Sequence, residues 1–86
     1  MADTSKRLEE EARKWLTRLE AEVKGMQKLA ELEGLDNSIE NIHSYIEDCK
    51  HFLEKGDFVN AFEAAIYSWG IFETLLSMHL IKVREK

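Results

Sequence analysis

Apolar residues recur at helical spacing in three segments of the chain, and glycine-containing turns separate these segments. In the first segment, over residues 4–33, they fall at steps of three and four: Leu8, Ala12, Trp15, Leu19, Val23, Met26 and Ala30. This spacing predicts an amphipathic helix with one buried face. Asp3 or Thr4 is expected to cap its start and Gly34 to end it. At a rise of about 1.5 Å per residue, such a helix is roughly 45 Å long. A small domain needs less, so one end is expected to project or to be covered by another subunit.

The second segment, over residues 38–55, repeats this arrangement. Its apolar positions are Ile39, Ile42, Ile46, Cys49 and Leu53. They predict a second amphipathic helix. Asn37 or Ser38 is its expected cap, because a polar residue lies about three positions further on.

The third segment, over residues 57–83, carries the bulkiest apolar side chains. Its stripe consists of Phe58, Phe62, Ala65, Trp69, Phe72, Leu76 and Leu80. Gly56 and Asp57 mark the sharpest turn before it, since glycine can end one helix and an aspartate carboxylate can accept hydrogen bonds from the next. The second and third helices are therefore expected to form a tight hairpin.

Short connections between helices favour antiparallel neighbours. We therefore predict an all-α fold, an antiparallel three-helix bundle with helices over about residues 4–33, 38–55 and 57–83. The first helix is expected to pack against the second, and the second against the third. With 86 residues the chain is long enough for one core, so residues 1–86 should form a single domain.

Gly70 stands out, because glycine inside a helix costs about 1 kcal/mol relative to alanine. The same segment carries other small residues: Ala61, Ala64, Ala65 and Ser68. Together with Gly70 they predict a patch that lets a neighbouring helix approach closely, with Trp15 as the expected contact. A ligand groove at Gly70 is the alternative.

Composition limits the classes of partner and the expected location. The net charge of −5 opposes binding to nucleic acid, which depends on Lys and Arg neutralising phosphates. No apolar run reaches the roughly 20 residues that a membrane span needs, and the first residues lack the apolar stretch of a secretory signal. The single cysteine, Cys49, suits a reducing compartment. We expect a cytoplasmic protein that binds neither nucleic acid nor membrane.

One polar series has the spacing of metal ligands. Glu40 and His43 have the Glu-x-x-His spacing of di-iron carboxylate bundles, and Glu47 and His51 continue along the same side. A di-iron site needs a second such motif and further carboxylates pointing into the core, whereas the inward stripe of this helix is apolar. We therefore expect a polar helix face and no cofactor, with zinc held by His43, Glu47 and His51 as the alternative.

Other candidate chemistry is sparse. The sequence contains no phosphate-binding glycine loop, no Gly-x-Ser-x-Gly, no His-Glu-x-x-His and no Cys-x-x-Cys. Cys49 falls on the core stripe and is expected to be a small buried residue, while His79 is expected at the surface near the end of the third helix. We expect no catalytic residues and no enzyme activity.

Three aromatic residues lie at the edges of the apolar stripes and not at their centres. They are Tyr45, Phe52 and Tyr67. If they are exposed together, they form an apolar patch of the kind that marks a protein interface. These residues are the predicted interaction surface.

Residues 52–58 read FLEKGDF, and the segment after them contains spaced alanines and then Tyr67 three residues before Gly70. In these elements, over residues 45–73, the chain resembles an archaeal domain-of-unknown-function family, number 357. The family has a FLEKGDY-like hairpin, an alanine-rich helix and a Tyr-x-x-Gly pattern. The resemblance implies an archaeal, cytoplasmic, helical protein without an accepted activity, so it carries over no catalytic residues.

The chain departs from the family pattern at two positions, and both departures preserve a buried role. Phe58 replaces the usual tyrosine, and Cys49 stands where a small residue is expected. Tetratricopeptide-like hairpins share some of these features, but a repeat array needs about three units. The nucleotidyltransferase-associated helical nucleases need an arginine followed four to six residues later by histidine, which this sequence lacks.

Two hypotheses about function follow. The first is an interaction or self-assembly module, with an unknown protein partner or a symmetric homodimer. The second is a bundle that binds a small ligand or a metal ion. The lack of convergent polar groups favours the first.

Overall fold

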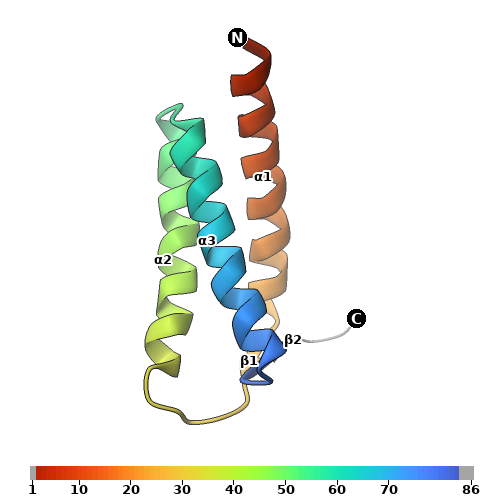
Figure 1. Cartoon of the computed structure of the whole chain (residues 1–86), viewed down its shortest axis with the longest axis vertical. Coiled ribbons are helices and arrows are strands. Elements are labelled where there is room, and N and C mark those ends of the chain that lie inside the picture. The colour runs from red at the N-terminus through yellow and green to blue at the C-terminus, as the bar shows by residue number, and fades with distance from the viewer. Residues whose placement is uncertain (1, 84–86) are drawn as a thin grey trace.

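The computed structural model describes residues 2–83 and contains three antiparallel helices with a short strand pair at one end (Figure 1). In chain order the elements are α1 (Ala2–Lys24), β1 (Met26–Lys28), α2 (Leu35–Glu54), α3 (Phe58–Ser77) and β2 (Ile81–Val83). The predicted three-helix bundle is confirmed, and the chain passes down, up and down again along its long axis. Among the described residues, no helix combines the length and apolar character needed to cross a membrane.

The predicted first helix over residues 4–33 is wrong at both ends. α1 begins at Ala2, so the expected caps Asp3 and Thr4 both lie inside the helix and do not precede it, and α1 stops at Lys24. Its 23 residues span roughly 35 Å, so its length no longer suggests a cover from another subunit. Gly25 follows, and Met26 to Lys28 continue as a strand because they find a backbone partner far along the chain.

That partner is β2, which lies within the predicted third helix and corrects its range of 57–83. The two strands pair antiparallel, with Gln27 opposite Lys82. The Leu29 N–H extends the ladder by donating to the Leu80 carbonyl at 2.9 Å. Ile81 points into the core with 1% of its surface exposed, so the strand pair closes one end of the bundle.

α3 ends at Ser77, and the chain turns at once towards β2. The Leu80 N–H donates to the Leu75 carbonyl at 3.0 Å, and the His79 N–H donates to the Leu76 carbonyl at 3.1 Å. These two bonds form a Schellman motif, in which the residue after the cap adopts the left-handed conformation. His79 occupies that position with φ of 61°, and it is exposed as the sequence predicted.

The hairpin between α2 and α3 forms as predicted. Gly56 has φ of 77° and donates to the Leu53 carbonyl, while the Asp57 N–H donates to the Phe52 carbonyl at 2.9 Å. The Asp57 carboxylate then accepts a hydrogen bond from the Asn60 backbone N–H at 3.3 Å. This turn ends one helix and caps the next within two residues.

The other end of α2 differs from the prediction over 38–55. The helix begins at Leu35 with Gly34 as its N-cap, so Asn37 and Ser38 lie inside the first turn and do not cap it. Gly34, expected to end the first helix, therefore begins the second. The Ser38 N–H donates to the Gly34 carbonyl at 3.0 Å, which closes this first turn.

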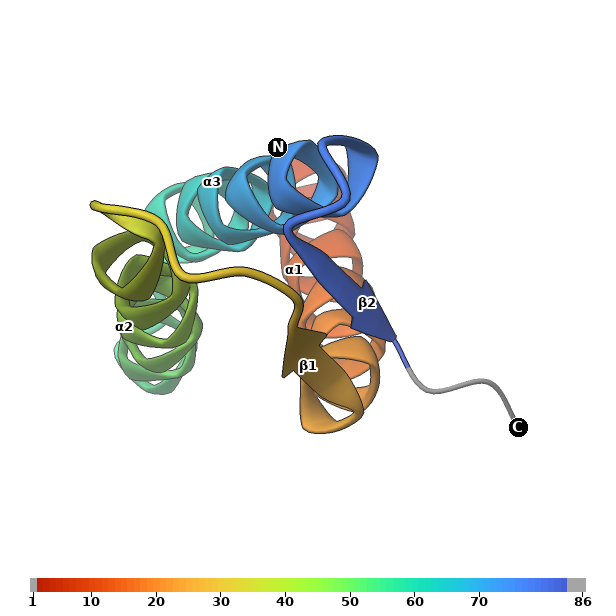
Figure 2. The same cartoon turned by 90° about the horizontal axis from the view of Figure 1, so that it is seen from below.

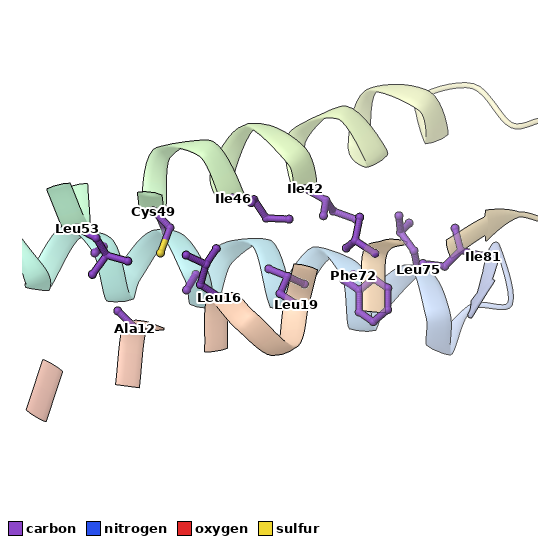
Figure 3. Packing of buried hydrophobic residues seen from close by; sticks show 14 of the residues in the cluster. Ala12, Leu16, Leu19, Ile42, Ile46, Cys49, Leu53, Phe72, Leu75 and Ile81 are labelled. Carbon is purple, nitrogen blue, oxygen red and sulfur yellow. The ribbon is translucent and has the colours of Figure 1, made fainter. Parts of the chain in front are cut away.

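α3 lies between the other two helices and packs against both (Figure 2). α1 was expected to pack mainly against α2, but the two contact each other much less than either contacts α3. The result is a flat molecule of 46 × 28 × 18 Å. Figure 3 shows side chains of all three helices meeting in one core, among them Leu19 of α1, Ile42 of α2 and Phe72 of α3.

Small residues form the centre of the buried side of α3. They are Ala61, Ala64, Ala65 and Ser68. The Ser68 hydroxyl is fully buried and donates to the Ile42 carbonyl at 2.8 Å, which shows how closely α2 approaches. The predicted small-residue patch is thus confirmed for these four, but Gly70 is not part of it.

Gly70 is exposed, and a Cβ atom added there would meet nothing within 4 Å. Trp15 contacts Trp69 and not Gly70, with ring centroids 5.7 Å apart.

Candidate interaction surface

The predicted surface of Tyr45, Phe52 and Tyr67 is divided in the structure. Tyr45 on α2 and Tyr67 on α3 lie together, with ring centroids 5.6 Å apart, and Tyr67 is 53% exposed. Phe52 lies two helical turns further along α2 and is half-buried against the core, beside the ring of His51. Tyr45 and Tyr67 therefore bridge the outer edges of two helices, while Phe52 belongs mainly to the packing.

A larger apolar surface lies along the outside of α3. Val59, Ile66 and Tyr67 are 63%, 40% and 53% exposed, and Met78 at the helix end is 59% exposed. We call Val59, Ile66, Tyr67 and Gly70, together with the flanking Glu63 and Glu73, the α3 outer face. All of these residues are exposed. α1 and α2 cover the two sides of α3, and no element of residues 2–83 covers this face.

The sequence contained a signal for this surface. α3 has only two charged residues among its 20 and is apolar around most of its circumference, which is typical of a helix buried on all sides. The helical spacing puts Ile66 beside the core stripe and does not reveal that its side chain is exposed. The reason is that a stripe identifies one buried face and does not show whether the remaining faces find a cover.

Gly70 forms the bottom of a shallow groove on this surface. The groove is lined by Ser38, Ile66, Tyr67, Gly70, Ile71, Thr74 and Leu75. Ser38 belongs to the first turn of α2, so the groove follows the boundary between α2 and α3. Because the position of a Cβ at Gly70 faces open space, an apolar side chain from outside can rest directly against the backbone.

Three exposed carboxylates lie on the two helices that form the groove. Glu63 and Glu73 lie on α3, and Asp48 lies one turn beyond Tyr45 on the same side of α2. α3 contains no lysine or arginine. None of the ion pairs found within the described part of the chain uses these three carboxylates, although Glu73 lines a hollow between α1 and α3 together with Arg18.

The gap between α1 and α2 is an open groove whose lining includes charged residues of both helices. The Lys50 ammonium contacts the Glu20 carboxylate at 2.7 Å and the Glu47 carboxylate at 3.3 Å. These hydrogen bonds raise the pKa of Lys50, that to Glu20 most strongly. Ala21 and His43 also line this gap. Glu20, Glu47 and Lys50 in this lining are paired with one another, whereas Lys24 takes part in none of the ion pairs found within residues 2–83.

The polar series of α2 does not converge. Glu40, His43, Glu47 and His51 are all exposed along the helix. Within residues 2–83, no three His, Cys, Asp or Glu side chains come close enough together to hold a metal ion. Cys49 is fully buried as predicted, and burial raises the pKa of its thiol.

The aromatic residues between α1 and α3 serve mainly to pack these helices. Trp69 lies against Trp15 on one side and stacks on Phe72 at 5.5 Å on the other. Arg18 and Lys14 lie over the Trp15 ring at 5.2 and 5.4 Å, where a cation is attracted to the face of the indole. These contacts cover the outer side of Trp15 with polar groups.

Together these observations define a small antiparallel three-helix protein, closed at one end by a strand pair and left with one uncovered apolar helix face. The chain belongs to DUF357, a family of proteins of unknown function whose model matches residues 6–81. It is similar to protein AF1782 from Archaeoglobus fulgidus, whose crystal structure is attributed to the same family. The two chains are 33% identical over 94% of this chain and 99% of that chain, with a TM-score of 0.82. A comparison with curated proteins gave no match.

Proposed function

We propose that this chain is a protein–protein interaction module that binds its partner through the α3 outer face. The observation that carries the proposal is the exposure of Val59, Ile66 and Tyr67 on a helix that is already packed on two sides. Contiguous apolar surface is a feature of binding sites, whereas single exposed apolar residues need no explanation.

The position of this surface supports the proposal. Ile66 and Tyr67 are neighbours on α3, and the Tyr67 ring contacts the ring of Tyr45 on α2. Tyrosine suits an interface because its ring adds apolar contact while its hydroxyl still bonds to water or to a partner. Part of the predicted surface, Tyr45 and Tyr67, therefore belongs to the proposed site, and Ile66 and Gly70 extend it.

The proposal includes no catalytic step, and the alternatives have less support. A small-ligand site needs convergent polar groups, and the polar side chains in the lining of the groove at Gly70 are the three hydroxyls of Ser38, Tyr67 and Thr74. A metal site needs clustered ligands, and the polar series of α2 is spread along an exposed face. A cytoplasmic location stays part of the proposal, since a single buried thiol at Cys49 suits a reducing compartment.

Substitution of Ile66 by glutamine tests this proposal. Glutamine is a good helix former of similar length, so Ile66→Gln removes apolar contact without a change of charge. Leu32→Gln is the matched control, because Leu32 is 56% exposed but lies in the loop before α2. Proteins that copurify with the tagged wild-type chain from its host should be lost with Ile66→Gln and kept with Leu32→Gln. Equal recovery with both variants would place the binding surface elsewhere.

A further inference from the structure

We infer that the α3 outer face accepts a basic amphipathic helix of another protein and not a second copy of this chain. This inference rests on the proposed function and names the chemistry of the partner. It is carried by the charges that flank the apolar groove. Glu63 and Glu73 lie on the face itself, and Asp48 lies beside it on α2.

The spacing of these carboxylates sets the spacing of the partner's cations. Glu63 and Glu73 are ten residues apart on one helix, which is about 15 Å along its axis. Ile66 and Gly70 lie between them, so the apolar part of the face has an acidic group at each end. A helix that carries lysine or arginine about ten residues apart, with apolar residues between, complements both features.

Gly70 indicates how the apolar part is filled. The groove has no side chain at its bottom, so a leucine, isoleucine or phenylalanine from the partner can rest on the backbone between Ile66 and Thr74. Close approach at a glycine brings two helices together and buries more of the flanking Tyr67 ring. An apolar residue at the centre of the partner helix is therefore expected.

A second copy fits the shape of the face but not its charge. Suppose that the α3 helices of two copies pack antiparallel and cross at Ser68. Ile66 of each copy then meets the gap at Gly70 of the other. The same symmetry places Glu63 of one copy opposite Glu73 of the other, twice. In a parallel arrangement Glu63 faces Glu63, so either orientation opposes like charges, and the net charge of −5 on each chain adds to the repulsion.

Two synthetic peptides test the inference. Both are helical, about five turns long, with the same leucine and alanine stripe; one carries two lysines about ten residues apart, and the other carries glutamates at those positions. Binding of each fluorescent peptide to the full chain is followed by anisotropy at low and high salt. We expect the basic peptide to bind roughly five- to tenfold more tightly, with the difference falling at high salt.

Charge reversal on the protein supplies the decisive comparison. The Glu63→Lys/Glu73→Lys variant should reverse the preference and bind the acidic peptide more tightly. Glu10→Lys/Glu33→Lys changes the net charge equally at exposed positions on α1 and in the loop, and it should keep the preference for the basic peptide. Ile66→Gln should weaken binding of both peptides.

The outcomes separate the inference from the proposed function. Equal binding of both peptides, still weakened by Ile66→Gln, would overturn the basic partner and leave the interaction face standing. Binding unaffected by Ile66→Gln, or no binding of either peptide, would count against the face itself. If sedimentation shows a dimer of the wild-type chain that Ile66→Gln dissociates, the occupant is a second copy and the inference is wrong.

Discussion

The left-handed backbone at His79 makes a quantitative prediction possible, because the two helix ends of α2 and α3 have the same hydrogen bonds but different residues. At the end of α2 the left-handed position is Gly56, with φ of 77°; at the end of α3 it is His79, with φ of 61°. Both belong to Schellman motifs with paired bonds between 2.9 and 3.2 Å. Only the glycine adopts this conformation without steric strain.

The size of the effect follows from two opposing contributions. A side chain in the left-handed region costs roughly 1–2 kcal/mol, and the greater freedom of glycine in the unfolded chain offsets about 0.4–1 kcal/mol of this. His79→Gly should therefore raise the free energy of unfolding by roughly 0.5–1 kcal/mol. Gly56→Ala should lower it by a similar amount. Since a Cβ at Gly56 would meet nothing within 4 Å, that loss is conformational and involves no clash.

Thermal and urea unfolding followed by far-ultraviolet circular dichroism measure both changes. For a domain of this size, the midpoint should rise by about 2–8 °C for His79→Gly and fall by a similar amount for Gly56→Ala. His79→Ala is the control, because it removes the exposed imidazole but keeps a Cβ at the strained position, and it should change stability by less than about 0.5 kcal/mol. If His79→Ala stabilises the protein as much as His79→Gly, the imidazole and not the backbone is the source of strain.

Three further predictions concern the buried groups. Ser68→Ala should lower the free energy of unfolding by about 1 kcal/mol in urea titrations, since the hydrogen bond to the Ile42 carbonyl is lost; an unchanged midpoint would contradict this. Ile81→Ala should lower the free energy of unfolding by about 2–4 kcal/mol, because Ile81 is buried. If the free energy of unfolding falls no more than for a substitution at an exposed residue, β2 does not close the core. Burial raises the pKa of the Cys49 thiol above its ordinary value of 9.0, so the folded state favours the neutral form. The contribution of this group to the free energy of unfolding is then fully present below pH 9.0 and is lost as the pH rises through the folded pKa. In urea titrations at increasing pH, the wild-type chain should therefore lose stability above pH 9.0, and Cys49→Ala should not show this loss.

The pattern of apolar residues predicted the helices well where one helix buries one face. On α2 four of the five predicted positions, Ile42, Ile46, Cys49 and Leu53, are buried, and the fifth, Ile39, is partly buried. On α3 the predicted stripe was displaced by about one residue, because the helix lies between two neighbours. Its centre therefore consists of alanines and Ser68, and Phe62 and Trp69 lie at the sides.

The candidate site was predicted in part. Tyr45 and Tyr67 were selected as residues at the edges of stripes, and the structure brings their rings into contact. Phe52 was selected on the same basis and lies apart from them, half-buried. Gly70 was interpreted as a packing contact, but only the arrangement of three helices shows that its side of α3 faces outward.

The sequence by itself determined the number of helices, their buried faces on α1 and α2, and the hinge at Gly56 and Asp57, because periodic burial and capping are local properties of the chain. The tertiary structure decided the strand pair, the start of α2 at Leu35 and the exposure of the α3 outer face. Residues 26–28 continue a helical pattern in sequence, but they become a strand because residues 81–83 supply backbone hydrogen bonds that no neighbouring residue could supply. Which face of α3 stays uncovered likewise depends on where α1 and α2 lie, and that is a property of the whole fold.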